Sequence, residues 1–295
     1  MVLLLTLSAI WGGSFIFMRY LAPLIGPVAT ADARMLLAGL ALMAFFLAIR
    51  FKPEWRRNWR HYLIMGVLNS AVPFLLFSAA ALYLPASMES ILNATAPMFG
   101  AVFSALWLGE ALTARKFTGL LLGISGVAVM SSLSPLPASR TTVLAVLACL
   151  AAPMCYGLAG VYMKKRAMGV KPMAIAGGSQ LLGGLALLPF LAVSPPRTGA
   201  LTLPVGLTAL AFALLCSAVA YLIYYRLIAD VGPTKALTVT FLIPVFGLLW
   251  GFLFLGETIS WSMLVGAAVV LAGTYLVAIP RRPTPRASPE RSAVL

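Results

Sequence analysis

The chain has 295 residues, of which 62% are hydrophobic and only 9% are charged, and its mean hydropathy is +1.01. A soluble domain of this length carries far more charge on its surface, so the composition excludes a soluble globular protein and predicts an integral membrane protein. The formal net charge of +14 at pH 7 does not indicate a nucleic-acid-binding protein, because the basic residues lie between apolar segments rather than along one face.

Ten apolar segments follow one another, separated by short connections that contain Pro, Gly or polar residues. A helix needs about 20 apolar residues to cross a bilayer, because each residue rises about 1.5 Å. The sequence therefore predicts an all-α integral membrane protein with ten transmembrane helices, over residues 2–22, 29–49, 61–83, 86–107, 114–133, 141–163, 172–193, 204–228, 232–254 and 260–279. The remaining segment, 280–295, is rich in proline and arginine and is expected to be a disordered basic tail.

Basic residues decide the expected orientation. Most of them follow the second, fourth, sixth, eighth and tenth apolar segments, and the opposite side of the membrane has only Arg19, Arg34, Arg140 and Arg197. Because cytoplasmic connections carry the excess of Lys and Arg, both termini are predicted to be cytoplasmic.

The first half of the chain is repeated in the second half. PMFGAVFSALWLGE at 97–110 matches IPVFGLLWGFLFLGE at 243–257, and IWGGSFIFMR from Ile10 matches CYGLAGVYMK from Cys155, with an offset of 145 to 147 residues throughout. Each copy contains five predicted spans, and an odd number inverts the second copy in the membrane. Inverted repeats are typical of transporters. The predicted divisions are a first repeat, a second inverted repeat and the tail, at 1–138, 139–279 and 280–295.

Several of these motifs resemble those of the EamA family of the drug/metabolite transporter (DMT) superfamily. They are WGGSF in the first span, the apolar run behind Arg34, and the Pro-x-Phe to Leu-Gly-Glu segment of each half. The chain is most similar to bacterial amino-acid exporters, including the YddG-type exporters of aromatic amino acids. The resemblance implies a transporter in the bacterial inner membrane that exports amino acids and related metabolites.

The third and eighth spans carry aromatic and hydroxyl residues on one helical face. Ser70, Phe74, Phe77 and Ser78 recur at i, i+4, i+7 and i+8, and the second copy has Ser217, Tyr221, Tyr224 and Tyr225. Tyrosine hydroxyls at mid-membrane depth need partners, which water or a substrate would supply, so these residues are predicted to bind substrate. The alternative is a seam between helices joined by small polar residues.

The fourth and ninth spans each place a polar residue one turn before a proline: Asn93 before Pro97 and Thr240 before Pro244. A proline lacks the N–H that would bond the carbonyl four residues earlier, so a freed carbonyl could hold a polar group of a substrate. A purely structural kink is the alternative.

Trp11 and Tyr156 lie on adjacent positions of the repeat near mid-span and could either stack on an apolar substrate or simply pack. Ser14, in the same WGGSF stretch as Trp11, completes the predicted substrate-binding set.

Charged residues near the helix ends are weaker candidates. Asp32, Arg34 and Glu89 lie within two turns of an outer helix end, where they are expected to reach the interface or pair with one another. The alternative for Arg34 is capture of a substrate carboxylate. Glu110 and Glu257 close their spans and are predicted to be interfacial turn residues.

Other functions fit the sequence less well. The chain has one histidine, seven acidic residues and three cysteines without metal-ligand spacing, so neither an enzyme nor a bound metal or cofactor is expected. A sugar-phosphate or nucleotide-sugar carrier should have Lys or Arg deep in several spans, and a proton-coupled drug exporter should have a glutamate in the first span. We therefore predict a monomeric exporter that works by alternating access. Because no acidic residue lies at the centre of a span, we also predict facilitative transport without proton coupling.

Overall fold

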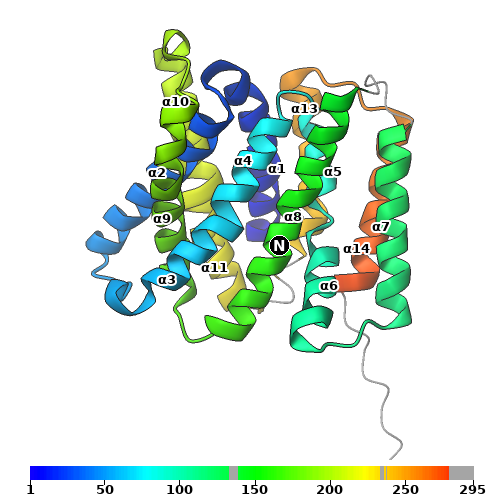
Figure 1. Ribbon diagram of the computed structural model, residues 1–295, viewed down its shortest axis with the longest axis horizontal. Coiled ribbons are helices and arrows are strands. Elements are labelled where there is room, and N and C mark those ends of the chain that lie inside the picture. Colours follow the sequence, from blue (N-terminus) through cyan, green and yellow to red (C-terminus); the bar gives the residue numbers. More distant parts are fainter. Residues whose placement is uncertain (133–138, 233–235, 237, 279–295) are drawn as a thin grey trace, which may run out of the picture.

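The computed structural model describes residues 1–132, 139–232, 236 and 238–278, which form a bundle of helices without a strand (Figure 1). Eight helical segments are long and apolar enough to cross a membrane, so the chain is a multi-pass membrane protein. They are α1 (Val2–Ile25), α2 (Pro27–Ala48), the continuous α3 (Trp55–Gly66), η1 (Val67–Ala71) and α4 (Val72–Ala80), the pair α5 (Ala86–Asn93) and α6 (Ala96–Leu108), α8 (Arg140–Arg166), α9 (Pro172–Val193), the continuous α10 (Leu203–Ala213), η3 (Leu214–Val219) and α11 (Ala220–Val231), and α14 (Trp261–Ala278).

Two further helices correspond to the other two predicted spans. The apolar helix α13 (Val239–Leu255) has 17 residues, at the lower end of the range for a membrane span. The helix α7 (Ala114–Ser132) has 19 residues but begins with the basic Arg115 and Lys116. A short 3₁₀ turn, η2 (Thr198–Ala200), precedes α10. Length and composition thus support eight crossing segments, and ten spans remain a prediction.

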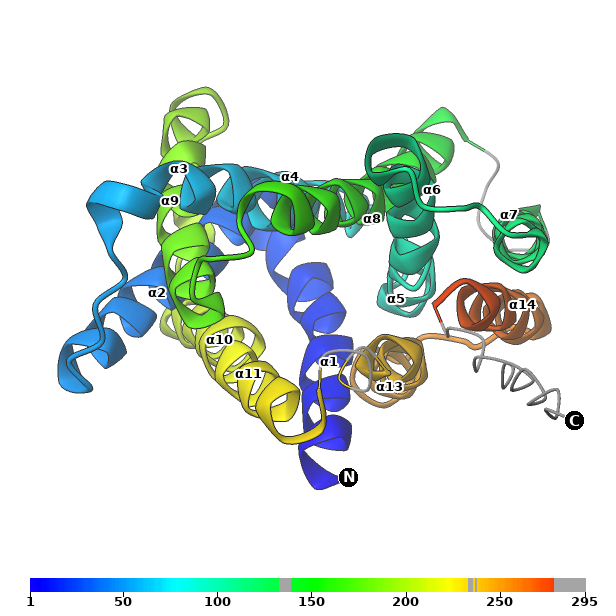
Figure 2. The ribbon, with the colours of Figure 1, turned by 90° about the horizontal axis from the view of Figure 1, so that it is seen from below.

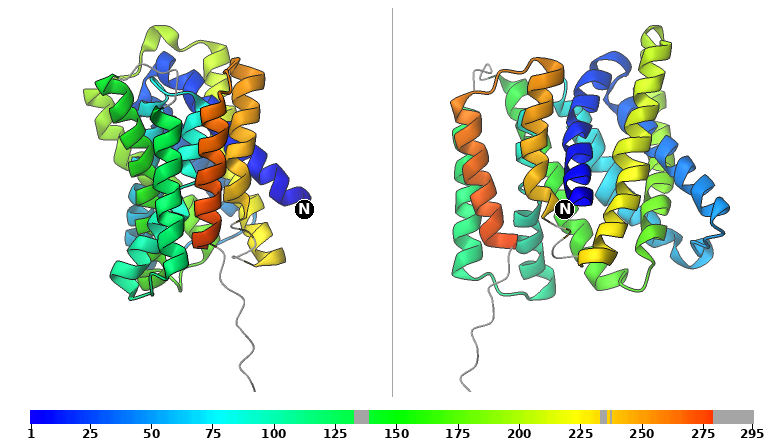
Figure 3. Two further views of the ribbon diagram at one scale, coloured as in Figure 1. Left: turned by 90° about the vertical axis from the view of Figure 1, so that its right-hand side faces the viewer. Right: turned by 180° about the vertical axis from the view of Figure 1, so that it is seen from behind.

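The helices are arranged around α1. Figure 2 shows α7 beside α14 at one edge of the molecule, and α2, α3 and α9 at the other. The helix α7 contacts α14, and α9 contacts both α2 and α3. In the rear view of Figure 3, α1 lies between α13 and α11 and contacts both. The helix α1 therefore contacts segments from both halves of the sequence.

The two long helices that were predicted to carry the site each contain a π-helical turn at matching positions of the repeat. The turn η1 contains Ser70 and the turn η3 contains Ser217. Pro73 follows η1, and because proline cannot form the ordinary i−4 bond, a widened turn accommodates it. No proline follows η3, where Ala220 takes its place. Such turns change the direction in which the following side chains point.

The two predicted proline kinks differ from each other. In the fourth span the helix breaks at Ala94 and Thr95, and Pro97 lies in the first turn of α6, where its missing N–H needs no partner. In the second copy Pro244 lies inside the single helix α13. The equivalent geometry expected from the repeat is therefore not found among the described residues.

Glycines allow close approach of helix backbones at matching places in the two halves. A Cβ on Gly12 of α1 would lie 2.9 Å from the backbone nitrogen of Gly247 on α13, and one on Gly157 of α8 would lie 2.8 Å from that of Gly100 on α6. These distances leave no room for a side chain. The sequence aligns Gly12 with Gly157 and Gly100 with Gly247, so equivalent residues make equivalent contacts.

The contact between α2 and α9 is reciprocal in the same sense. A Cβ on Gly39 would lie 2.7 Å from the backbone of Leu181, and one on Gly184 would lie 2.8 Å from the side chain of Leu36. In the repeat, Gly39 corresponds to Gly184 and Leu36 to Leu181. Each helix thus presents to the other the same pair of positions, as a two-fold axis between them would require.

The Leu-Gly-Glu segments end their helices as predicted. Gly109 and Gly256 both adopt left-handed backbone conformations, with φ of 67° and 65°, directly after α6 and α13. The two glutamates then differ. Glu257 accepts hydrogen bonds from the backbone N–H groups of Ala86 (2.7 Å) and Ser87 (3.0 Å), which places an anion at the start of α5.

Candidate functional site

A cavity of about 250 Å³ lies where α1, α2, η1, α4, α5, α8, α11 and α13 converge. An apolar cavity of about 150 Å³ can hold a benzene molecule, so this one has room for a compound of amino-acid size. The cavity is lined by Trp11, Ser14, Phe15, Met18, Arg34, Asn69, Phe74, Phe77, Asn93, Tyr156, Tyr221, Tyr224, Thr240 and Ile243. It therefore combines residues from both halves of the chain.

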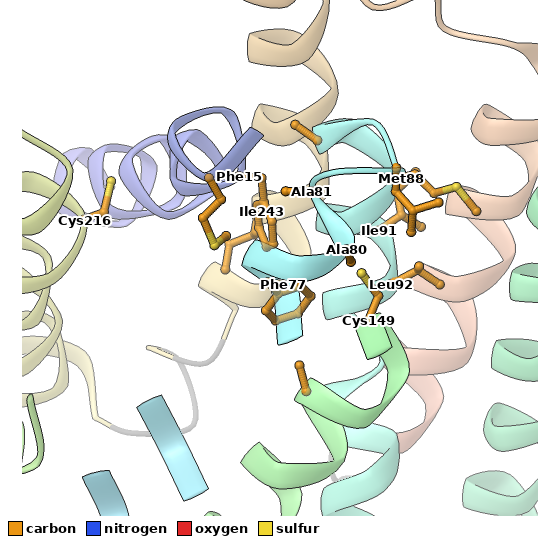
Figure 4. Close-up of a cluster of buried hydrophobic side chains, with 14 of the residues drawn as sticks. Phe15, Phe77, Ala80, Ala81, Met88, Ile91, Leu92, Cys149, Cys216 and Ile243 are labelled. Atoms are coloured by element: carbon orange, nitrogen blue, oxygen red, sulfur yellow. The ribbon is translucent and has the colours of Figure 1, made fainter. Parts of the chain in front are cut away.

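Aromatic side chains form much of the cavity wall. The ring of Trp11 lies 5.3 Å from that of Tyr224 and 6.4 Å from that of Tyr221. Phe15, one turn after Trp11 on α1, meets Phe77 edge to face at 5.3 Å, and both belong to the apolar core that also contains Ile243 (Figure 4). Rings held this way form a rigid apolar surface on which a substrate side chain could stack.

Arg34 is the charged residue of the lining. Its side chain crosses from α2 to η3, where Nε donates to Ser217 Oγ (3.0 Å) and Nη2 donates to the Cys216 carbonyl (3.2 Å). The guanidinium carbon lies 3.7 Å from the centre of the Phe74 ring and 4.7 Å from that of Phe212. These contacts hold a guanidinium group in one orientation at the edge of the cavity.

The predicted pairing of Arg34 with an acidic residue is wrong, since no ion pair joins Arg34 to an acid of the described chain. Asp32, two residues away, has a buried carboxyl oxygen without a hydrogen-bond partner. Arg34 makes no ion pair because its side chain points toward η3, where it bonds two acceptors, and toward the face of the Phe74 ring.

Glu89 also departs from its prediction. Its exposed fraction is 0%, and neither carboxyl oxygen has a hydrogen-bond partner. It therefore neither reaches the interface nor pairs with Arg34. The helix α5 packs against α1, α8 and α13, which cover it.

Nine of the fifteen residues predicted to bind substrate lie in the cavity wall. They are Trp11, Ser14, Phe74, Phe77, Asn93, Tyr156, Tyr221, Tyr224 and Thr240. The sequence did not predict that Phe15, Met18, Asn69 or Ile243 line the cavity. Arg34 was expected mainly to reach the interface or to pair with an acidic residue. Phe15 lies next to Ser14, and Asn69 next to Ser70, so the motifs already examined contained two of them.

Three of the four predicted serines, Ser70, Ser78 and Ser217, are not part of the cavity wall. Ser70 is fully buried and accepts a hydrogen bond from Nε2 of Gln180 (3.0 Å), and the Tyr221 hydroxyl interacts with both. Ser217 accepts from Arg34, and Ser78 is buried without a hydrogen-bond partner. Ser70 and Ser217 therefore join neighbouring helices, which is the alternative role that small polar residues have in membrane bundles.

Three other predicted residues lie elsewhere. Pro97 borders a second cavity, Pro244 is buried within α13, and the side chain of Tyr225 lies outside the part of the structure that is described.

The second cavity is larger, about 780 Å³, and lies between α6, α7, α8 and α14. Its lining includes the charged Glu110, Lys116 and Lys164, and it shares Tyr156 and Thr240 with the first cavity. The Glu110 carboxylate accepts a hydrogen bond from Lys164 Nζ (3.0 Å), which holds the pKa of this carboxyl below its ordinary value. The two cavities are thus separated by shared side chains.

A helical membrane bundle with an amphiphilic cavity of amino-acid size has the features of a small-molecule transporter. The model of the EamA-like transporter family matches residues 1–132 and 143–279. The chain therefore belongs to the EamA family of transporters, which are not enzymes.

Individual relatives agree with this assignment. The chain is 28% identical over 281 residues to the uncharacterized transporter YvbV of Bacillus subtilis, covering 94% of this chain and 90% of that protein. It is 26% identical over 269 residues to a probable terminal-alkyne amino-acid exporter of Streptantibioticus cattleyicolor, covering 90% and 89%. A crystal structure of a protein with 17% identity superimposes with a TM-score of 0.64 over 93% of this chain and 94% of that one, which shows the shared fold.

Proposed function

We propose that this transporter exports amino acids, chiefly neutral ones with aromatic or hydrophobic side chains, together with related metabolites. The observation that carries the proposal is the composition of the central cavity wall. Rings of Trp11, Tyr221 and Tyr224, and rings of Phe15 and Phe77, line a volume of amino-acid size. The relative from Streptantibioticus cattleyicolor, a probable terminal-alkyne amino-acid exporter, supports the same substrate class.

The two alternative substrates fit this wall less well. A sugar phosphate or nucleotide sugar carries a dianion, and Arg34 is the one Lys or Arg among the lining residues of the central cavity. A proton-coupled exporter of cationic drugs needs an acidic residue facing the drug, and the described lining contains neither Asp nor Glu. Both remain outcomes of the experiment below.

The proposed architecture is a pair of inverted five-helix repeats, residues 1–138 and 139–279, with ten membrane-spanning helices. The matching contacts of Gly12 with Gly247 and of Gly157 with Gly100 support it, as do the matching π turns. We propose that the two repeats exchange conformations and so open the cavity alternately to each side. The second cavity, which meets the first at Tyr156 and Thr240, would be part of the route to the cytoplasm.

The proposed orientation has both termini on the cytoplasmic side of a bacterial inner membrane, and the proposed working unit is a monomer. Cysteine labelling tests the orientation in a variant that lacks the three native cysteines. A cysteine at the exposed Gly199 should react with an impermeant thiol reagent added to intact cells, and one at the exposed Lys52 should not. The reverse pattern would overturn both the orientation and the direction of transport.

Reconstitution tests the substrate class. Purified protein in liposomes, preloaded with an unlabelled amino acid, should take up the same radiolabelled amino acid by counterflow, with the fastest exchange for phenylalanine, tyrosine, tryptophan and leucine. Protein-free liposomes and a panel that includes a sugar phosphate and a cationic drug are the controls. Exchange of either control compound without exchange of any amino acid would refute the proposal.

A further inference from the structure

The guanidinium group of Arg34 carries a positive charge that no described acid balances. Arg34 is only 5% exposed. Both hydrogen bonds of its guanidinium group go to neutral acceptors, the Ser217 hydroxyl and the Cys216 carbonyl. A charge inside a membrane bundle is costly, and proteins retain one there when it serves substrate binding or a relay. Since packing alone would be served by an apolar residue, the charge indicates a ligand of opposite sign.

The contacts of Arg34 leave one edge of the guanidinium group available. A guanidinium has five N–H groups, and the described contacts use one on Nε and one on Nη2. The rings of Phe74 and Phe212 lie close to the group. No described hydrogen bond uses Nη1, and Arg34 lines the cavity. The arrangement therefore favours a planar anion that approaches in the plane of the group and accepts two parallel hydrogen bonds, as a carboxylate does.

The π turn η3 explains how this orientation is maintained. Both acceptors for Arg34 are consecutive residues of η3, the backbone carbonyl of Cys216 and the side chain of Ser217. Beside them, Gln180 and Ser70 are joined by a hydrogen bond and interact with Tyr221. A polar network therefore supports the wall on this side, whereas the rest of the lining is mainly aromatic.

The same lining offers little to a substrate amino group. An ammonium ion would meet neutral amides such as Asn69 and Asn93 rather than a carboxylate, because the lining contains no Asp or Glu within the described residues. A bound carboxylate neutralises the charge of Arg34, whereas an added ammonium restores a net positive charge in the cavity. We propose that Arg34 anchors the carboxylate of the substrate, and that this group rather than the α-amino group is what the cavity recognises. This inference rests on the proposed transport of aromatic amino acids.

Four compounds that share one phenyl ring test the inference with wild-type protein in liposomes. They are L-phenylalanine, 3-phenylpropionate (no amino group), L-phenylalaninamide (no carboxylate) and phenethylamine (neither carboxylate nor amide). Each is used to inhibit counterflow of labelled phenylalanine. We expect 3-phenylpropionate to inhibit at least as well as phenylalanine, and the amide and the amine to be at least tenfold weaker.

Two substitutions assign the selectivity to Arg34. Arg34→Gln should remove the discrimination between phenylalanine and its amide, and Arg34→Lys, which keeps the charge but not the planar pair of donors, should retain part of it. Arg197→Gln is the matched control, since Arg197 is exposed and, among the described residues, its side chain bonds only the Pro23 carbonyl. Size-exclusion profiles establish that each variant is folded.

The possible outcomes separate the two proposals. Equal inhibition by phenylalanine and its amide in the wild type would overturn the carboxylate inference while leaving amino-acid export intact. Unchanged discrimination in folded Arg34→Gln would overturn the role of this residue. Absence of any counterflow of labelled phenylalanine in the wild type would overturn the proposed function as well. If Arg34→Gln does not fold, the wild-type comparison alone still decides whether the carboxylate is required.

Discussion

Replacing Gly12 by alanine should destabilise the protein because it separates α1 from α13. A Cβ at this position would lie 2.7 Å from Cβ of Phe246 and 2.9 Å from the carbonyl oxygen of Ile243. To reach an ordinary contact distance, the two helices would have to move apart by roughly 0.7 Å. Two of the opposing atoms belong to the backbone of α13, so rotation of a flexible side chain cannot relieve the overlap.

The expected magnitude follows from the cost of overpacking. Inserting a methyl group into a tightly packed interface destabilises by about 1–3 kcal/mol. Exchanging glycine for alanine within a helix favours the helix by about 1 kcal/mol wherever space allows. Gly160 in α8 provides the control, because a Cβ there would have no neighbour within 4 Å. The difference between Gly12→Ala and Gly160→Ala therefore isolates the overpacking, about 1–3 kcal/mol.

The measurement is thermal unfolding of the purified variants in detergent, followed by the fluorescence of the six tryptophans. Gly12→Ala should unfold several degrees below wild type, and Gly160→Ala at or above it. Gly157→Ala, whose Cβ would lie 2.8 Å from the backbone of Gly100, should resemble Gly12→Ala. If Gly12→Ala is as stable as Gly160→Ala, the close backbone approach is not required by the fold.

Three further predictions concern transport and pH. Tyr224→Ala should weaken substrate binding by about 1 kcal/mol, roughly fivefold in the concentration for half-maximal counterflow, because one aromatic surface of the cavity is lost; Phe252→Ala, at a residue 56% exposed on α13, should not, and equal effects would mean that the rings only pack. Glu110→Gln should lower the stability at pH 7 by less than about 1 kcal/mol, since the pair with Lys164 is exposed; as the folded-state pKa of Glu110 lies below its ordinary value of 4.5, this difference is full above pH 4.5 and should vanish as the pH falls through that lower pKa. Finally, counterflow should proceed at equal pH, a pH gradient should drive no accumulation of a neutral substrate, and Glu89→Gln should leave both results unchanged; gradient-driven accumulation that this variant abolishes would identify Glu89 as a proton carrier.

Much of the membrane architecture could be predicted from the sequence, because a long apolar run has few options. In a bilayer, every backbone polar group of such a run must be satisfied within the segment, which selects a helix. The ends of α6 and α13 could also be predicted, because the left-handed backbone conformation that follows each helix occurs at a glycine, Gly109 or Gly256. Exceptions arose at Pro97 and Pro244, which occupy matching positions of the repeat although the helix breaks just before Pro97 and is continuous through Pro244.

The helical period correctly predicted that Phe74 and Phe77 line the same cavity. It did not correctly predict the position of the Ser70 hydroxyl. Phe74 and Phe77 are three residues apart on α4 and both line the cavity, as the 3.6-residue period requires. Ser70 lies in the π turn η1, where that period does not hold, and its hydroxyl bonds Gln180 instead. The π turn η3 could not be predicted from its local sequence, because no proline follows it as Pro73 follows η1.

Only the tertiary structure decided the environment of the charged groups. Arg34 and Ser217 are 183 residues apart, and no local pattern indicates that one side chain donates to the other. The sequence alone determined that Arg34 lies in an apolar helix, and hence that its charge needs a reason. Which partners it has depends on how α2 packs against η3, and hydrogen bonds and ring contacts act over a few ångströms in space rather than along the chain.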